Sequence, residues 1–111
     1  MLGVSLMAES RDQCVLVRFK LSDDTLGTLD DLEEIHEFSD ALTALIAERR
    51  AGEFDGHECG GGEGTLFMYG PDADWLFHVI EPALKTWEPL KGGHVIKRHG
   101  GPGSRVERIE F

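Results

Sequence analysis

The 111-residue sequence predicts an α+β fold, in which two helices cover one face of an antiparallel sheet. Three observations predict it. Residues 14–21 alternate between apolar and polar side chains, which is the period of a half-buried strand. Residues 29–46 repeat apolar side chains every three or four positions, as an amphipathic helix does. Two glycine-rich segments, 60–62 and 100–103, each separate a pair of strand-like runs and are typical of hairpin turns.

The first strand and the first helix have well-defined apolar faces. The strand is expected to turn one face to the core, carrying Val15, Val17, Phe19 and Leu21. The apolar stripe of the helix comprises Leu29, Leu32, Ile35, Phe38, Leu42, Leu45 and Ile46. Thr28 and Asp31 resemble a capping box at its start, and Gly52 is a natural stop at its end. Both boundaries therefore agree with the periodicity.

The rest of the chain continues the same pattern. Further strands are predicted over residues 54–59, 65–69, 94–99 and 105–111. A second helix is predicted to begin at Pro71, because proline fits the first helical position, and Pro82 is expected to kink it or to mark its late portion. The element order is β-α-β-β-α-β with an extra final strand. Right-handed crossovers then give a ferredoxin-like sandwich, with two helices on one face of an antiparallel sheet.

Domain organisation follows from that order. Residues 13–111 form a single domain, and residues 1–12 form an N-terminal extension that is expected to be flexible. Met1 and Met7 both remain candidates for the natural start. The opening apolar run lacks a basic region and a cleavage site, so we expect no secretory signal, no membrane association and a cytoplasmic location.

The charge is strongly negative and unevenly distributed. The net charge is −10, which disfavours nucleic acid as a partner. Residues 91–111 hold five basic groups against two acidic ones, a balance of +3, so residues 1–90 hold −13. An acidic surface either keeps the protein in solution or binds a basic protein partner. Cys14 and Cys59 are too few for a disulfide framework.

The predicted sheet leaves one face without helices. Leu16, Arg18 and Lys20 of the first strand are expected on it, together with apolar side chains of the strand over 65–69. A part-apolar exposed face of this kind marks an interface. We therefore expect a homodimer that uses this face or an edge strand.

The chemistry-bearing residues gather in the first hairpin. Two-residue periodicity places Glu53, Asp55, His57 and Cys59 on one face of a strand. Asp55, His57 and Cys59 offer the ligand types of a zinc site. His57 and Cys59 could alternatively form a nucleophile pair, and His57 beside Tyr69 could act as a general base in a cavity between sheet and helices. No cofactor-binding motif is recognised, and the glycine segment fails as a phosphate loop because it leads into a strand.

Residues 55–58, 60–62 and 66–74 resemble a pattern found in a family of small uncharacterised bacterial proteins of ferredoxin-like fold. A fainter, fold-level likeness is to the acidic protein inhibitor of ribonuclease E, whose aromatic signature is absent here. These resemblances imply the fold and a bacterial origin, and no site residues. The sequence thus favours a non-catalytic, acidic binding or regulatory module. The alternatives are a dimeric enzyme with His57 as general base, and a metal-binding protein that uses His57 and Cys59.

Overall fold

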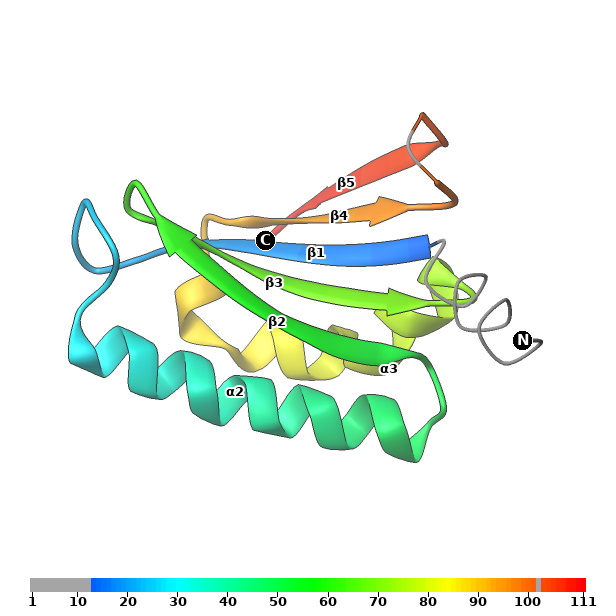
Figure 1. Ribbon diagram of the computed structural model, residues 1–111, viewed down its shortest axis with the longest axis horizontal. Helices are drawn as coiled ribbons and strands as arrows, with labels where there is room; N and C mark the ends of the chain where they lie inside the picture. Colours follow the sequence, from blue (N-terminus) through cyan, green and yellow to red (C-terminus); the bar gives the residue numbers. More distant parts are fainter. Residues whose placement is uncertain (1–12, 102) are drawn as a thin grey trace, which may run out of the picture.

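The computed structural model describes residues 13–101 and 103–111 (Figure 1). Its elements in chain order are β1 (Gln13–Lys20), α2 (Leu29–Glu48), β2 (Glu53–Gly60), β3 (Glu63–Gly70), α3 (Ala73–Thr86), the 3-10 helix η1 (Glu88–Leu90), β4 (His94–Arg98) and β5 (Val106–Glu110). The extension predicted over residues 1–12, with both candidate start sites, lies outside the described residues.

The five described strands form an antiparallel sheet in the order β2-β3-β1-β4-β5. Both helices lie on the same face of that sheet (Figure 1). The first four strands have the ferredoxin-like order, and β5 extends the sheet beyond β4. The predicted fold class is therefore confirmed, including its extra C-terminal strand.

The core lies between the helices and one face of the sheet. Apolar side chains from the three central strands are buried there, namely Val15, Val17, Phe19, Leu66, Met68 and Val95. Opposite them, α2 buries Ile35, Phe38, Leu42 and Ile46, while α3 buries Leu76, Ile80 and Leu84. Within residues 13–101 and 103–111, no polar or charged residue is buried. Apart from the thiol of Cys14, which is 1% exposed, the ionisable groups of the described residues therefore lie at least partly at the surface.

The ends of α2 follow the sequence signals. Thr28 and Asp31 form the predicted capping box, in which the side chain of each accepts a hydrogen bond from the backbone N–H of the other. Leu29 was expected on the buried stripe, but this first helical residue is 85% exposed, because it precedes the turns that contact the sheet. After the helix, Gly52 has φ +144°. A Cβ at that position would lie 1.9 Å from the carbonyl oxygen of Tyr69, so only glycine fits.

The start of α3 differs from the prediction by two residues. Asp72 is the N-cap, and its carboxylate accepts hydrogen bonds from the backbone N–H groups of Asp74 and Trp75. Pro71 therefore precedes the helix and does not occupy its first position. The helix begins after Asp72 because the Asp72 carboxylate can accept hydrogen bonds from the unpaired N–H groups of the first turn, which a proline side chain cannot do. Pro82 lies inside the helix, which continues to Thr86, so it marks the late portion as expected.

Candidate functional site

A β-bulge divides the polar edge that the sequence predicted on β2. The register shifts between Phe54 and Gly56, and Gly56 has φ +112°. As a result, Glu53 pairs with Tyr69 on the face without helices. His57 instead pairs with the buried Leu66 on the helix-covered face. The prediction that Glu53, Asp55, His57 and Cys59 share one face was wrong, because one extra residue reverses the alternation.

The bulge also separates His57 from Tyr69. Tyr69 lies in register with Cys14 on the face without helices, and His57 lies toward the helices. His57 is exposed, and its ring packs edge-on against His36 of α2 with 5.7 Å between centroids. The expected cavity between sheet and helices, lined by His57 and Tyr69, is therefore not assembled.

Neither cysteine has the environment of an activated nucleophile. Burial raises the pKa of the Cys59 thiol, and the charge of Asp31 raises it further. Burial also raises the pKa of Cys14, although Arg98 opposes the shift. A thiol with a raised pKa carries little thiolate at neutral pH, so its nucleophilicity is low.

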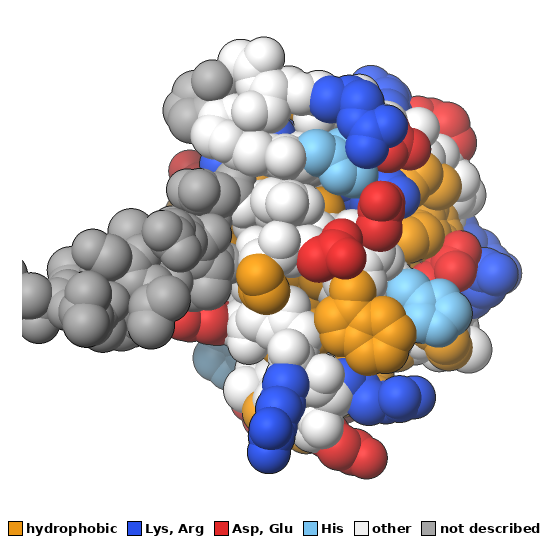
Figure 2. Space-filling view, turned by 90° about the vertical axis from the view of Figure 1, so that its right-hand side faces the viewer, with side chains coloured by type: hydrophobic (Ala, Val, Ile, Leu, Met, Phe, Trp, Pro, Cys, Tyr) orange, Lys and Arg blue, Asp and Glu red, His pale blue; other side chains and the backbone are white. Residues whose placement is uncertain are grey.

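The two tryptophans lie in different environments. Trp87 is half-buried and stacks on Phe38 with 4.2 Å between ring centroids, while Phe19 contacts it edge-on at 4.8 Å. Trp75 is 39% exposed and stacks with His78 at the start of α3. Figure 2 views this end of the molecule, where a hydrophobic ring lies against a histidine with acidic side chains nearby. Trp87 thus belongs to the core, and Trp75 is an exposed aromatic group.

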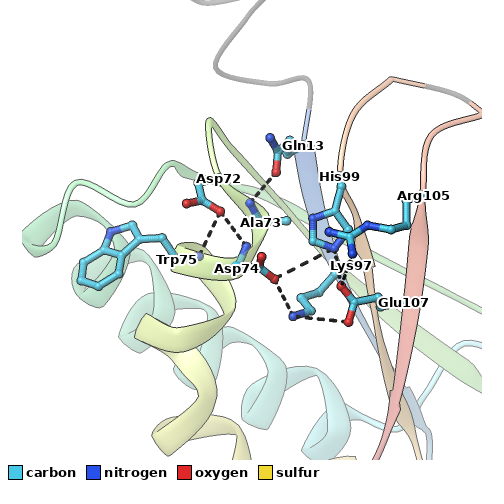
Figure 3. Close-up of polar contacts among 9 residues, drawn as sticks. All are labelled: Gln13, Asp72, Ala73, Asp74, Trp75, Lys97, His99, Arg105 and Glu107. Carbon is cyan, nitrogen blue, oxygen red and sulfur yellow. Dashed lines mark hydrogen bonds and ion pairs between the residues drawn. The ribbon is translucent and has the colours of Figure 1, made fainter.

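An ionic cluster that the sequence did not reveal joins α3 to the β4–β5 hairpin (Figure 3). Lys97 Nζ donates to Asp74 Oδ1 at 2.7 Å and lies 4.0 Å from Glu107 Oε2. His99 Nε2 lies 2.7 Å from Glu107 Oε1 and 4.0 Å from Asp74 Oδ1. The Lys97 ammonium also lies 5.1 Å from the centroid of the Phe77 ring. The hydrogen bond from Lys97 is the main cause that lowers the pKa of Asp74.

This cluster contains the ligand types of a metal site. Among the described residues it is the single group of three His, Cys, Asp or Glu side chains whose ligand atoms, from Asp74, His99 and Glu107, lie within 4.8 Å of one another. Asp55, His57 and Cys59, the ligands that the sequence suggested, are not brought together in this way. Lys97 already forms ion pairs with both carboxylates. The cluster is therefore an ion-pair network in which an ammonium group occupies the place of a metal cation.

The face of the sheet without helices, here called the open face, is a second candidate. Its half-buried apolar residues Leu16, Phe67, Tyr69 and Ile96 lie at its centre, beside Cys14. Its acidic residues are Glu53, Glu58, Glu63 and Glu110, and its basic residues are Arg18, Lys20, Arg98 and Arg108. These eight in-register residues sum to a formal charge of zero, in a chain whose net charge is −10, and Asp55, which lies at the bulge and is absent from the strand register, is not among them.

The open face is hollowed only shallowly. A depression of about 410 Å³ at the β2–β3 end of this face is lined by Arg18, Glu58, Cys59, Gly60, Glu63, Thr65 and Phe67. No polar side chain is buried beneath it within the described residues, so it lacks the convergent buried groups of a small-molecule site. A broad and shallow surface of this kind is suited to another protein surface.

Comparisons with protein-family models, curated proteins and solved structures found no match to this chain. The fold implied by the resemblances to a bacterial family and to the inhibitor of ribonuclease E is confirmed, whereas membership of either family stays a prediction. Within residues 13–101 and 103–111, no helix has the length and apolarity needed to cross a membrane.

Proposed function

We propose that this protein is a non-catalytic binding module that self-associates through its open face. The observation that carries the proposal is the balance of four acidic and four basic in-register residues on that face, in a strongly acidic molecule. Two copies that approach through other surfaces bring net negative charge together. Two copies that approach through the open face bring together apolar centres with no net repulsion.

The dimensions of the open face suit a modest interface. Five strands about 4.8 Å apart, and the eight residues of β1 at about 3.3 Å each, outline roughly 24 by 26 Å. That is about 600 Å² per copy, against about 800 Å² per partner in a standard interface. We therefore expect a dimer that dissociates in the micromolar range rather than an obligate one.

Sedimentation velocity over a concentration series tests the proposal. Phe67→Glu puts a carboxylate at the centre of the open face, where it should weaken the dimer at least tenfold. Leu29→Glu makes the same kind of change at an 85% exposed position in the helix layer and serves as the matched control. Circular dichroism checks that both variants fold. The proposal is refuted if the native chain stays monomeric at several hundred micromolar, or if both variants weaken the dimer equally.

A second candidate activity is the binding of a basic protein segment by α2. A groove of about 300 Å³ lies between Glu34 and Glu37 of the helix and the rings of Phe38 and Trp87. Apolar walls with an acidic rim suit the stem and head of a lysine or arginine side chain. Such binding should weaken steeply with salt and should be lost in Glu34→Gln/Glu37→Gln. Titration with a tetralysine peptide, and with Glu33→Gln/Asp40→Asn as control, tests it.

A further inference from the structure

We propose that β5 of one copy pairs antiparallel with β5 of a second copy, so that the two five-stranded sheets continue as one sheet. The two-fold axis of this pair passes through Ile109 and lies perpendicular to the sheet. The contact uses the edge of the sheet, so it goes beyond the stacking of open faces. Under this axis both open faces point the same way and remain accessible.

The outer backbone groups of β5 are directed away from the sheet. In the described part of the chain, no further strand lies beyond β5. The N–H of Phe111 donates to the carbonyl of Gly93, and the carbonyl of Arg105 accepts from the N–H of His99. The odd-numbered residues therefore direct their backbone groups toward β4. Because this direction alternates along an antiparallel strand, the even-numbered residues of β5 offer theirs to a new strand.

The two edges of the sheet differ in regularity. At one edge, β2 is interrupted by the bulge at Gly56. At the other edge, β5 keeps an unbroken register with β4 and contains no proline. Bulges and prolines protect an edge against pairing. In addition, α3 packs against β1, β3 and β4, and β5 extends away from the helix layer (Figure 1). The edge of β5 is therefore the one suited to receive a strand.

The charges of β5 are complementary to a second copy of the same strand. When Ile109 lies opposite its own copy, Arg108 lies opposite the partner's Glu110, and Glu110 lies opposite the partner's Arg108. Within one copy, Arg108 already donates to Glu110. The four side chains then form a ring of alternating charge that sums to zero. Charged side chains on an edge normally discourage pairing, but in this register pairing gives each of them a second opposite charge.

The helix-covered side of β5 supports the same register. Ile109 is half-buried against the core and meets the partner's Ile109 at a non-hydrogen-bonded position. The Cα atoms of such a pair lie about 4.5 Å apart, which brings the two apolar side chains into contact. Glu107 lies opposite the partner's Phe111 and keeps its contact with His99 of its own copy. Apolar groups therefore meet on one side of the paired strands and opposite charges on the other.

Other registers match less well. An axis at a charged residue of β5 places two like charges directly opposite each other, which is unfavourable. An axis at Val106 would require residues 103–105 to continue the strand, but they belong to the hairpin loop, and Gly103 has φ +90°. Ile109 is therefore the position that the sequence of β5 favours for the axis.

The contact is smaller than the proposed contact between open faces. Residues 107–111 of each copy overlap, and each pair of Arg108 with Glu110 exchanges two backbone hydrogen bonds. We therefore expect edge pairing to be weaker than face stacking and to join the stacked dimers at higher concentration. A test that traps a weak contact is needed.

Disulfide trapping supplies that test. Ile109→Cys is made in a Cys59→Ser background, where the remaining Cys14 is buried, and is oxidised in a glutathione redox buffer. We expect disulfide-linked dimers, because the paired Cα atoms are within disulfide reach. Val106→Cys is the matched control on the same strand. Its side chain is 55% exposed, but its two copies would lie about 20 Å apart along the strands. Equal trapping of the two variants, or stronger trapping of Val106→Cys, would overturn the inference.

Charge reversal tests the pairing between copies. Arg108→Glu and Glu110→Arg are each added to Ile109→Cys, and one of the two variants is labelled with ¹⁵N. Each variant alone repels its own copy, whereas a mixture restores opposite charges across the axis. We expect heterodimers in excess of their statistical share, and a statistical mixture would contradict the register. If Ile109→Cys does not fold, the same charge variants without the cysteine are compared by sedimentation, where the mixture should associate more than either variant alone. Equal association would overturn the inference.

Failure of edge pairing is distinguishable from failure of the proposed function. Phe67→Glu disrupts the open face, so adding it to Ile109→Cys should leave trapping unchanged. Loss of trapping in this variant would show that Ile109 meets its copy only through stacking, and the inference would be wrong. Conversely, trapping in a chain that shows no open-face dimer would refute the proposed function and support the edge contact. Circular dichroism confirms that each variant folds.

Discussion

Replacing Lys97 by methionine tests whether the ammonium group of Lys97 stabilises the ionic cluster by neutralising Asp74 and Glu107. Methionine keeps most of the length and apolar packing of the lysine stem but removes its charge. The hydrogen-bonded pair with Asp74 is partly screened, because Asp74 is 59% exposed, so it contributes about 1 kcal/mol. The contact with Phe77 adds about 0.5–1 kcal/mol. At about 4 °C per kcal/mol, the combined loss of about 1.5–2 kcal/mol should lower the melting temperature by about 6–8 °C.

The same replacement should convert the cluster into a cation site. Asp74 and Glu107 lose their counter-ion, and His99 remains beside them. An imidazole and two carboxylates are zinc ligands. If the variant binds Zn²⁺ with a dissociation constant of about 10 µM, then 1 mM Zn²⁺ stabilises it by about 2.7 kcal/mol, more than the replacement removed.

Differential scanning calorimetry with and without Zn²⁺ measures both effects. Lys85→Met is the matched control, because Lys85 is 65% exposed and contacts only Glu81 at 3.7 Å among the ion pairs of the described residues. It should change the melting temperature little and create no zinc response. Adding His99→Ala to the Lys97 variant should abolish the response. If Zn²⁺ stabilises the native chain as much as the variant, the reasoning about Lys97 is wrong.

Three further predictions concern two core residues and the dependence of stability on pH in the acidic range. Gly64→Ala should cost about 1–3 kcal/mol in urea denaturation, because its Cβ would lie 2.4 Å from the Phe19 ring; an unchanged midpoint would contradict this packing. Met68→Ala should cost about 2–5 kcal/mol, since Met68 is fully buried, and a loss below 1 kcal/mol would be inconsistent with that burial. The hydrogen bond from Ser22 is the main cause that lowers the pKa of Asp31 to about 2. The resulting stability is present above about pH 4 and is lost as the pH falls toward 2, so Asp31→Asn should flatten that limb of a pH–stability curve.

The fold could be predicted from the sequence because its signals are local and agree with one another. The alternation of β1 and the apolar stripe of α2 each require a particular element. Glycine turns then set the order of the strands along the chain. The handedness of crossovers leaves few ways to arrange that order, and the observed one is among them.

The candidate site could be predicted less well, because two of its determinants are not periodic. The bulge at Gly56 reverses the faces of His57 and Glu53 through one added residue. A glycine inside a strand is a signal for a bulge, so this error was open to correction from the sequence. The contact of Lys97 with Asp74 was not, because it joins groups 23 residues apart through the packing of α3 against the sheet.

The strand order converts the uneven charge along the sequence into an uneven charge across the open face. Along the sequence it is a difference between residues 1–90 and 91–111. The strand order turns it into a difference between the two sides of one surface, because the β2–β3 hairpin and the β4–β5 hairpin flank β1. β5 adds both Arg108 and Glu110 to this face, so it contributes no net charge there. The polarity comes instead from the acidic residues of the β2–β3 hairpin on one side and from Arg18, Lys20 and Arg98 of β1 and β4 on the other. A ferredoxin-like sheet that ended at β4 would therefore keep the same polarity.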